Sequence, residues 1–226
     1  IPFPAWTTWI ALLFSLYVTV QVGKFWYADT LFATGYHTSR TGNVGSAVSS
    51  IRTAIALNNS EPLYHDELAG AYASLAVAAF EEKNATHASE LAGLALAEST
   101  RALSISPNNV NYWKTRTKVY YTLSAIDPSL NLQAIESLDH ALTRSPNAPK
   151  IYYNLAILTG RTGDTDAAIA HLLQAKKLKN NYRDVYFALH VFYTERKQAQ
   201  QARAIANEYL TNVDPSDQQF IDLRTK

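Results

Sequence analysis

The sequence PKIYYNLAILTGRTGDTDAAIAHLLQAKKLKNNY, residues 149–182, has the pattern of two helices joined by a tight turn. Its first half carries a stripe at helical spacing, formed by Tyr152, Leu155, Ala156 and Thr159. Its second half carries another at i, i+4 and i+7, formed by Ala168, Leu172 and Ala175. Between them, Gly163 can adopt the positive φ that ends a helix, and Asp164 can cap the next one. The stretch therefore predicts an antiparallel helical hairpin.

This hairpin resembles the tetratricopeptide repeat (TPR), whose consensus places aromatic, Leu, Gly and Ala residues at fixed positions over about 34 residues. It departs from that consensus at Thr159, usually aromatic, and at Asn180, usually proline. The resemblance implies an all-α, right-handed solenoid of stacked helical hairpins.

Related patterns flank this stretch and predict about five units. We expect these at 28–60, 61–108, 109–148, 149–182 and 183–215, with a capping helix starting in 216–226. The second unit is long, which predicts that both of its helices are extended. In the third unit, Trp113 and Tyr120 are expected to begin and continue the first helix.

An apolar segment precedes these units. Ala5–Val22 contains no charged residue, and its length as a helix is about 27 Å, close to the hydrocarbon thickness of a bilayer. Trp6 and Trp9 lie at one end and residues 24–27 (KFWY) at the other, which is typical of headgroup anchors. We therefore predict a transmembrane helix with its flanks at 1–27, contacting the membrane through 5–22. A buried solenoid helix is the alternative, and a cleaved signal peptide is less favoured.

Composition narrows the functional classes. The net charge of +1 gives no electrostatic reason to expect nucleic-acid binding. The absence of cysteine excludes disulfides, thiol catalysis and Cys-based zinc sites. The sequence also contains no methionine, so we expect a segment of a longer protein.

The sequence predicts no catalytic, cofactor-binding or metal-binding residue, and no cofactor. The six histidines are scattered, and the motifs of nucleotide-binding, serine-hydrolase and zinc-protease sites do not occur. The polar run His65–Glu67 is expected to be a solvated helix face, since consecutive helical residues point in different directions. Asp164 and Asp166 are explained by helix capping rather than by calcium binding.

The TPR resemblance implies a concave groove lined by the first helix of each unit. Carried over position by position, the expected lining residues are Phe32, Tyr36, His65, Tyr72, Asn111, Lys114, Lys118, Tyr121, Lys150, Tyr153, Arg161 and Phe187. Tyrosines beside cations suit a protein or peptide partner, an acidic one in particular, or a sugar ring. A soluble face without a ligand is the alternative.

A second resemblance covers roughly the first half of the chain. The segments FWYADTLFATG (25–35) and LNNSEPLYHDELAGAYASLA (57–76), behind an apolar helix, resemble the C-terminal region of bacterial O-antigen ligase/polymerase-type membrane proteins. In that family a last membrane helix leads directly into TPR units, and catalytic residues lie in parts that this chain does not include. The resemblance implies a non-catalytic interaction module of a glycan-handling protein. The alternative is a single-anchor TPR adaptor or assembly protein for a membrane or secretion complex.

The side of the membrane is predicted differently by two arguments. Lys24, Arg40 and Arg52 follow the apolar helix, and the positive-inside rule then favours cytoplasmic repeats. The ligase resemblance implies a bacterial inner membrane with the repeats on the extracytoplasmic side, and our expectation follows it.

Overall fold

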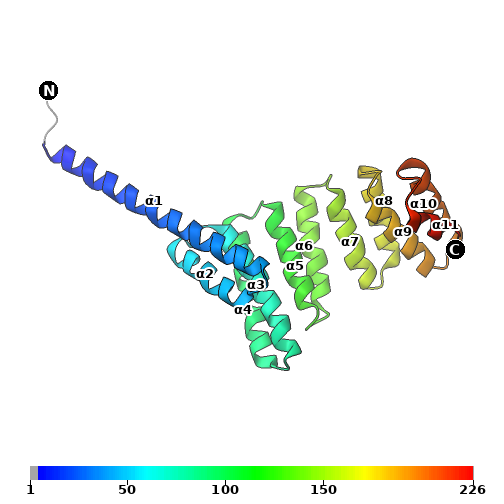
Figure 1. Ribbon diagram of the computed structural model, residues 1–226, viewed down its shortest axis with the longest axis horizontal. Coiled ribbons are helices and arrows are strands. Elements are labelled where there is room, and N and C mark those ends of the chain that lie inside the picture. The colour runs from blue at the N-terminus through cyan, green and yellow to red at the C-terminus, as the bar shows by residue number, and fades with distance from the viewer. Residues whose placement is uncertain (1–4, 226) are drawn as a thin grey trace. The chain divides into compact units, whose positions relative to one another are not determined.

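The computed structural model describes residues 5–225, and within them the chain is all-helical. The helices are α1 (Ala5–Arg40), α2 (Val44–Leu57), α3 (Pro62–Glu81), α4 (Ala85–Ile105), α5 (Val110–Leu123), α6 (Leu130–Arg144), α7 (Pro149–Arg161), α8 (Thr165–Leu178), α9 (Arg183–Glu195), α10 (Ala199–Asn212) and α11 (Gln218–Thr225). Figure 1 shows them as successive hairpins. The predicted all-α class is confirmed.

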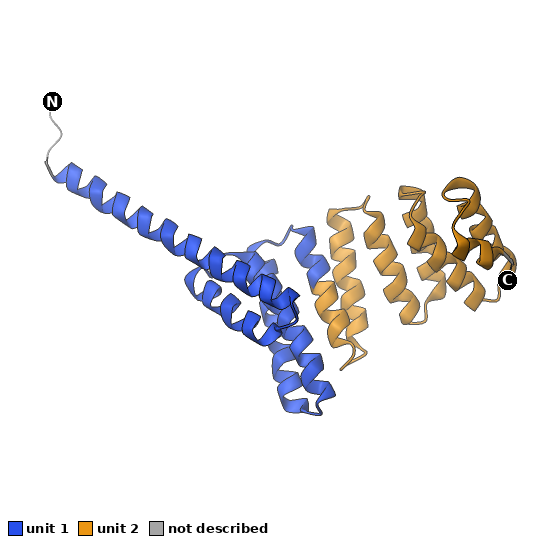
Figure 2. Ribbon diagram, viewed as in Figure 1, with its two compact units in different colours: residues 1–115 blue, residues 116–226 orange. Residues whose placement is uncertain are grey.

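The chain divides into two compact units, residues 1–115 and 116–226 (Figure 2). In the first unit α1 packs on α2 and α3 packs on α4. In the second unit α7 packs on α8, α9 on α10, and α10 on α11. Helix α5 contributes its first part to one unit and its last part to the other.

Four hairpin turns have the same backbone conformation. The second residue after the end of each first helix has a positive φ, at Gly42 (89°), Lys83 (62°), Gly163 (92°) and Lys197 (60°). The next N–H then donates to a carbonyl five residues back, as from Asp164 to Thr159 at 3.2 Å. The Asp164 side chain also accepts from the Ala167 N–H at 3.0 Å, so its predicted capping role is confirmed.

Small residues let the helices of each hairpin approach closely. Ala156, Ala168 and Ala175 are fully buried, as the stripes in residues 149–182 predict. Two glycines mark the closest approaches. A Cβ on Gly35 would lie 2.7 Å from Ile51 Cγ1, and one on Gly160 would lie 2.4 Å from Phe192 Cζ. Any larger side chain at these positions would push the neighbouring helix away.

Helix α1 is continuous for 36 residues but packs along only its second half. None of residues 6–27 is buried, and Ala28 is the first fully buried residue of the described chain. In Figure 1 this apolar half extends beyond α2, α3 and α4. The alternative of a buried solenoid helix is therefore wrong for this segment.

The second hairpin is long, because α3 has 20 residues and α4 has 21, whereas α7 and α8 have 13 and 14. In the third hairpin α5 contains both Trp113 and Tyr120, but its buried apolar residues are Tyr112, Val119 and Leu123. The Trp113 indole N–H instead donates to the Pro107 carbonyl at 2.8 Å, which draws the ring toward the preceding turn.

The short helix α11 covers the end of the second unit. Its Phe220 is fully buried and stacks on Tyr209, with ring centroids 3.9 Å apart. Asp217, just before α11, accepts from Arg183 of α9 at 2.7 Å. This ion pair and the aromatic stack hold α11 on the α9–α10 hairpin.

The positive φ at these turns predicts that two substitutions change the stability of the protein in opposite directions. Lys197→Gly should stabilise the protein by about 0.5–1 kcal/mol, because a non-glycine residue is strained at positive φ. Gly163→Ala should destabilise it by about 1 kcal/mol for the same reason. Urea unfolding of the full chain in detergent, followed by circular dichroism, measures both changes. Equal effects of the two substitutions would contradict this account of the turns.

Candidate interaction surface

In the first unit, two predicted groove residues are engaged in helix packing. The Phe32 ring stacks on Tyr64 of α3, with centroids 4.7 Å apart. The Arg40 guanidinium lies over the Tyr36 ring at 4.7 Å. Both aromatic residues are half-buried. Phe32 thus contributes to the contact between α1 and α3, and both residues offer only part of their surface to a ligand.

Two further residues predicted to line the groove belong to the core. His65 is 3% exposed and Tyr72 is 6% exposed, so neither can contact a ligand in the groove. The prediction is wrong for these two positions because α3 is enclosed by helices on several sides, whereas the consensus positions assume one open face. Asn111 and Lys114 remain accessible, and the Lys114 Nζ donates to Asn111 Oδ1 at 3.2 Å.

Three consecutive residues of α3 bind three different helices, and we call Tyr64–Asp66 the α3 junction. The Tyr64 hydroxyl is hydrogen-bonded to Asp29 of α1. His65 Nδ1 lies 2.5 Å from Glu98 Oε2 of α4. Because neighbouring residues of a helix project in different directions, the polar run reaches three neighbours at once.

The third contact is made by Asp66, whose Oδ2 accepts from the Thr115 hydroxyl of α5 at 2.9 Å. Glu67, the next residue, lies 3.8 Å from the Arg40 guanidinium at the end of α1. The expectation of a solvated face is therefore wrong for His65 and Asp66, which are 3% and 8% exposed. The sequence showed the polar run but not the helices packed around it.

Burial changes the acidity of the α3 junction. Burial, reinforced by the hydrogen bond to Asp29, raises the pKa of the Tyr64 phenol. Burial also raises the pKa of the Asp66 carboxyl to about 7, although the hydrogen bond from Thr115 opposes the shift and the charge of Glu67 adds to it. Near neutral pH, Asp66 is thus close to half protonated.

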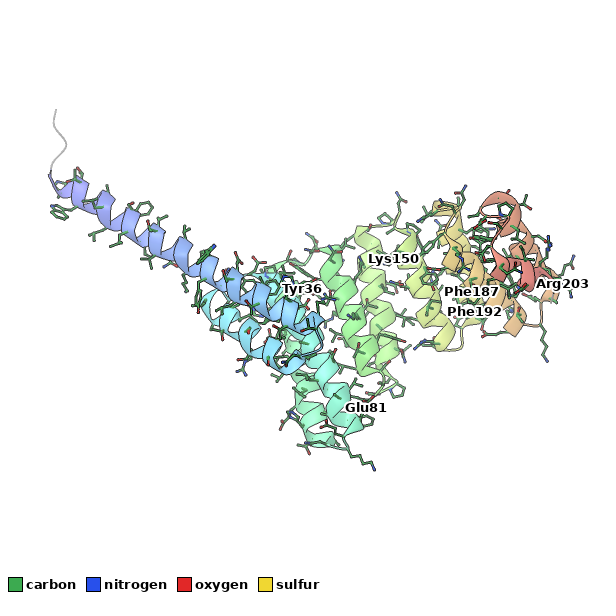
Figure 3. All side chains as sticks on the ribbon, in the orientation of Figure 1. Tyr36, Glu81, Lys150, Phe187, Phe192 and Arg203 are labelled. Carbon is green, nitrogen blue, oxygen red and sulfur yellow. The ribbon has the colours of Figure 1, made fainter. Side chains whose placement is uncertain are left out.

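In the second unit, the remaining predicted residues gather on the first helices of successive hairpins. Arg161 of α7 lies over the Tyr121 ring of α5 at 4.8 Å, which joins the two helices by a cation–π contact. Lys118 and Lys150 are exposed, and Tyr153 and Phe187 are half-exposed. Figure 3 labels Lys150, Phe187 and Phe192 on this part of the chain. We call Lys118, Tyr121, Lys150, Tyr153, Arg161 and Phe187 the second-unit groove set.

Aromatic contacts hold parts of this set in place. Tyr153 faces Tyr182, with ring centroids 5.5 Å apart. Burial and the nearby Asp184 charge raise the pKa of the Tyr153 phenol, which keeps it a neutral hydrogen-bond donor. Beside it, Phe192 of α9 lies against Gly160 of α7, and this contact closes the space between the two helices.

A cavity of about 380 Å³ lies between α9, α10 and α11, and no motif in the sequence predicts it. Its lining includes His190, Val191 and Thr194 of α9, Ala202 of α10 and Leu223 of α11. Burial lowers the pKa of His190, which favours the neutral imidazole. The cavity is mainly apolar and could hold a side chain of a bound peptide.

Among residues 5–225, no group of three or more histidine or carboxylate side chains is placed to hold a metal ion. The chemistry that the described side chains support is recognition through aromatic rings, cations and small apolar spaces.

Comparison with known proteins shows which fold this geometry shares. The tetratricopeptide repeat model matches residues 149–182. The chain has the TPR fold. Solved TPR-type structures extend the likeness beyond that one repeat, although no curated protein matches the sequence.

Three solved structures illustrate the likeness. MamA has a TM-score of 0.61 at 14% identity, covering 82% of this chain and 91% of MamA. The pilF protein of Pseudomonas aeruginosa has a TM-score of 0.57 at 19% identity, covering 84% and 78%. YrrB, a TPR protein with an unusual peptide-binding site, has a TM-score of 0.57 at 13% identity, covering 87% and 91%. At these identities the comparison establishes the TPR fold and nothing finer.

The pKa of Asp66 predicts a pH-dependent stability. Between about 4 and 7 the folded chain retains a proton that the unfolded chain loses, so the free energy of unfolding should fall as pH rises through this window. Asp66→Asn cannot lose a proton and still accepts the hydrogen bond from Thr115. It should therefore be more stable than the wild type by a few kcal/mol at pH 8, and nearly equal to it at pH 4.

Thermal unfolding of the full chain in detergent, compared across this pH range, measures the difference. Asp184→Asn provides a control, because Asp184 is an exposed residue in the first turn of α9. If the difference in stability between the wild type and Asp66→Asn does not change with pH, the raised pKa of Asp66 is contradicted.

Proposed function

We propose that this chain is a membrane-tethered TPR scaffold. Residues 5–22 of α1 insert into a bilayer, and the hairpins that follow present a surface to a protein or peptide partner. The observation that carries the proposal is the change in burial along α1 near Ala28. None of residues 6–27 is buried, whereas Ala28 and Gly35 are buried, although all belong to one unbroken helix.

The exposed apolar half of α1 would be unfavourable in water unless lipid or protein covered it. The exposed half of α1 includes Trp9, Leu13 and Phe14, each about two-thirds exposed (66%, 66% and 67%). Exposed rings and aliphatic side chains on every side of a helix are typical of a lipid-facing segment. Lys24 and Trp26 lie where the headgroups of such a bilayer would begin.

The second-unit groove set supports an acidic or carboxylate-bearing partner. Lys118, Lys150 and Arg161 supply positive charge, and Tyr121 and Tyr153 supply flat apolar surface with hydroxyl groups. Such a mixture binds extended peptides well, because the rings contribute area at low entropic cost and the cations orient carboxylates. A sugar ring stacked on a tyrosine is the second ligand class that this chemistry fits.

For the whole protein, we infer that the chain is the non-catalytic C-terminal part of an O-antigen ligase/polymerase-like membrane protein. The likeness of residues 25–35 and 57–76 supports this, and it would put the repeats on the extracytoplasmic side of a bacterial inner membrane. The alternative is a single-anchor TPR adaptor or assembly protein for a membrane or secretion complex. The coding sequence upstream of Ile1 separates the two, because only the ligase-like protein requires further membrane spans there.

The tether predicts membrane behaviour that depends on α1. The full chain expressed in bacteria should pellet with membranes and resist carbonate extraction, whereas the same chain without residues 1–27 should not. The physical reason is the loss of about twenty apolar side chains from contact with lipid. Extraction of the full chain by carbonate would contradict the tether. Protease cleavage of the repeats in spheroplasts, compared with inverted vesicles, then reports their side of the membrane.

The groove predicts a charge-dependent affinity. A fluorescein-labelled, glutamate-rich peptide should bind the full chain in detergent, and binding should weaken with salt. Lys118→Glu combined with Lys150→Glu should weaken it roughly tenfold, since each reversed exposed charge costs on the order of 0.5–1 kcal/mol. Lys177→Glu, on exposed α8 surface, is the matched control. Fluorescence anisotropy measures affinity, and equal losses in the control and the double variant would contradict a groove site.

A further inference from the structure

The turn between α2 and α3 lies at the same level of α1 as the end of its apolar half. The register of the α1–α2 hairpin is the first evidence for the level of this turn. A Cβ on Gly35 would lie 2.7 Å from Ile51 Cγ1 and 3.0 Å from the Ala47 carbonyl, so Gly35 faces the stretch 47–51. The helices are antiparallel and rise equally per residue. Counting back along α1 and forward along α2 therefore brings Leu57, the last residue of α2, near the level of Tyr27.

A separate set of contacts places the start of α3 at the same level along α1. The Tyr64 hydroxyl is bonded to Asp29, and the Tyr64 ring stacks on Phe32 at 4.7 Å. These contacts hold the first turn of α3 against α1 just beyond Tyr27. Leu63, next to Tyr64, is left 44% exposed.

The distance along α1 from the end of the apolar segment to Tyr27 matches the thickness of a headgroup layer. Tyr27 lies about 8 Å beyond Val22 along the helix axis, at about 1.5 Å per residue. The polar layer on one side of a bilayer is roughly 5–8 Å thick. A turn at the level of Tyr27 therefore lies within or against that layer when α1 spans the hydrocarbon core.

We propose that residues 57–63, LNNSEPL, form a second membrane contact, in which Leu63 enters the headgroup layer beside Tyr27. The composition fits this environment, because two leucines flank a polar stretch of asparagine, serine and glutamate. The exposed Asn59 amide can donate to headgroup oxygens, while Leu63 contacts apolar groups within the headgroup layer. The proposal rests on the tether proposed above and extends it from one helix to a two-point contact.

A second contact has a mechanical consequence for the first unit. One spanning helix leaves the attached domain able to tilt relative to the bilayer plane. Contact at the α2–α3 turn restrains this tilting, since the turn is fixed to α1 through Tyr64 and Gly35. The α3–α4 tip at Lys83 is then directed away from the bilayer, because α3 extends for 20 residues from this turn.

The experiment uses the natural absence of cysteine from the sequence. Single substitutions Leu13→Cys, Ser60→Cys, Leu63→Cys and Lys83→Cys are made in the full chain, labelled with a nitroxide and reconstituted in phosphatidylcholine vesicles. Accessibility to oxygen and to a water-soluble nickel chelate is measured by electron paramagnetic resonance. Circular dichroism of each labelled variant confirms that the helices are retained.

The expected result is a graded depth. The label at Leu13→Cys should be shielded from nickel, and labels at Ser60→Cys and Leu63→Cys should show intermediate shielding that disappears in the chain lacking residues 1–27. The label at Lys83→Cys should stay fully accessible to nickel. If both turn labels are as accessible as the Lys83→Cys label while the Leu13→Cys label is shielded, the second contact is wrong and the tether stands. If the Leu13→Cys label is itself accessible, both proposals fall.

Discussion

Neighbouring helices in this chain touch through glycine and alanine, and the rest of the fold depends on that close approach. Ala156, Ala168 and Ala175 bring α7 and α8 together, and Gly35 does the same for α1 and α2. Close backbones leave room for large side chains only beside the contact, where Leu155 and Leu172 are fully buried. A solenoid needs this arrangement, because each hairpin is stabilised only by its immediate neighbours.

The α3 junction adds a directional element to this apolar packing. Hydrophobic contact fixes how closely helices approach, but it tolerates sliding and rotation. Hydrogen bonds from Tyr64, His65 and Asp66 to three different helices remove that freedom. Burying these polar groups costs free energy, which is the reason why the pKa of Asp66 is raised. The hydrogen bond from Thr115 to the Asp66 carboxyl offsets part of this cost.

The continuity of α1 links the proposed membrane segment to the repeats. A flexible linker would let the solenoid diffuse around its anchor, whereas an unbroken helix transmits orientation directly. Gly23 is the only glycine in the apolar half, and it does not interrupt the helix. Residues of this helix before Ala28 are apolar and exposed, and those after it pack on α2 and α3; under the proposed tether, this difference gives the first unit a defined position at a membrane.

Local pattern was enough to predict the all-α class, the 149–182 hairpin and the apolar N-terminal helix, because periodicity and turn residues act over a few residues. Asp164 and Gly163 have their roles for reasons visible in their immediate neighbours. The burial of His65, Asp66 and Tyr72 could not be predicted in this way, since it depends on α1, α4 and α5 enclosing α3 from distant parts of the chain. The buried residues of α5 and the cavity beside His190 could not be predicted for the same reason, because the face of a helix that is covered depends on its neighbours.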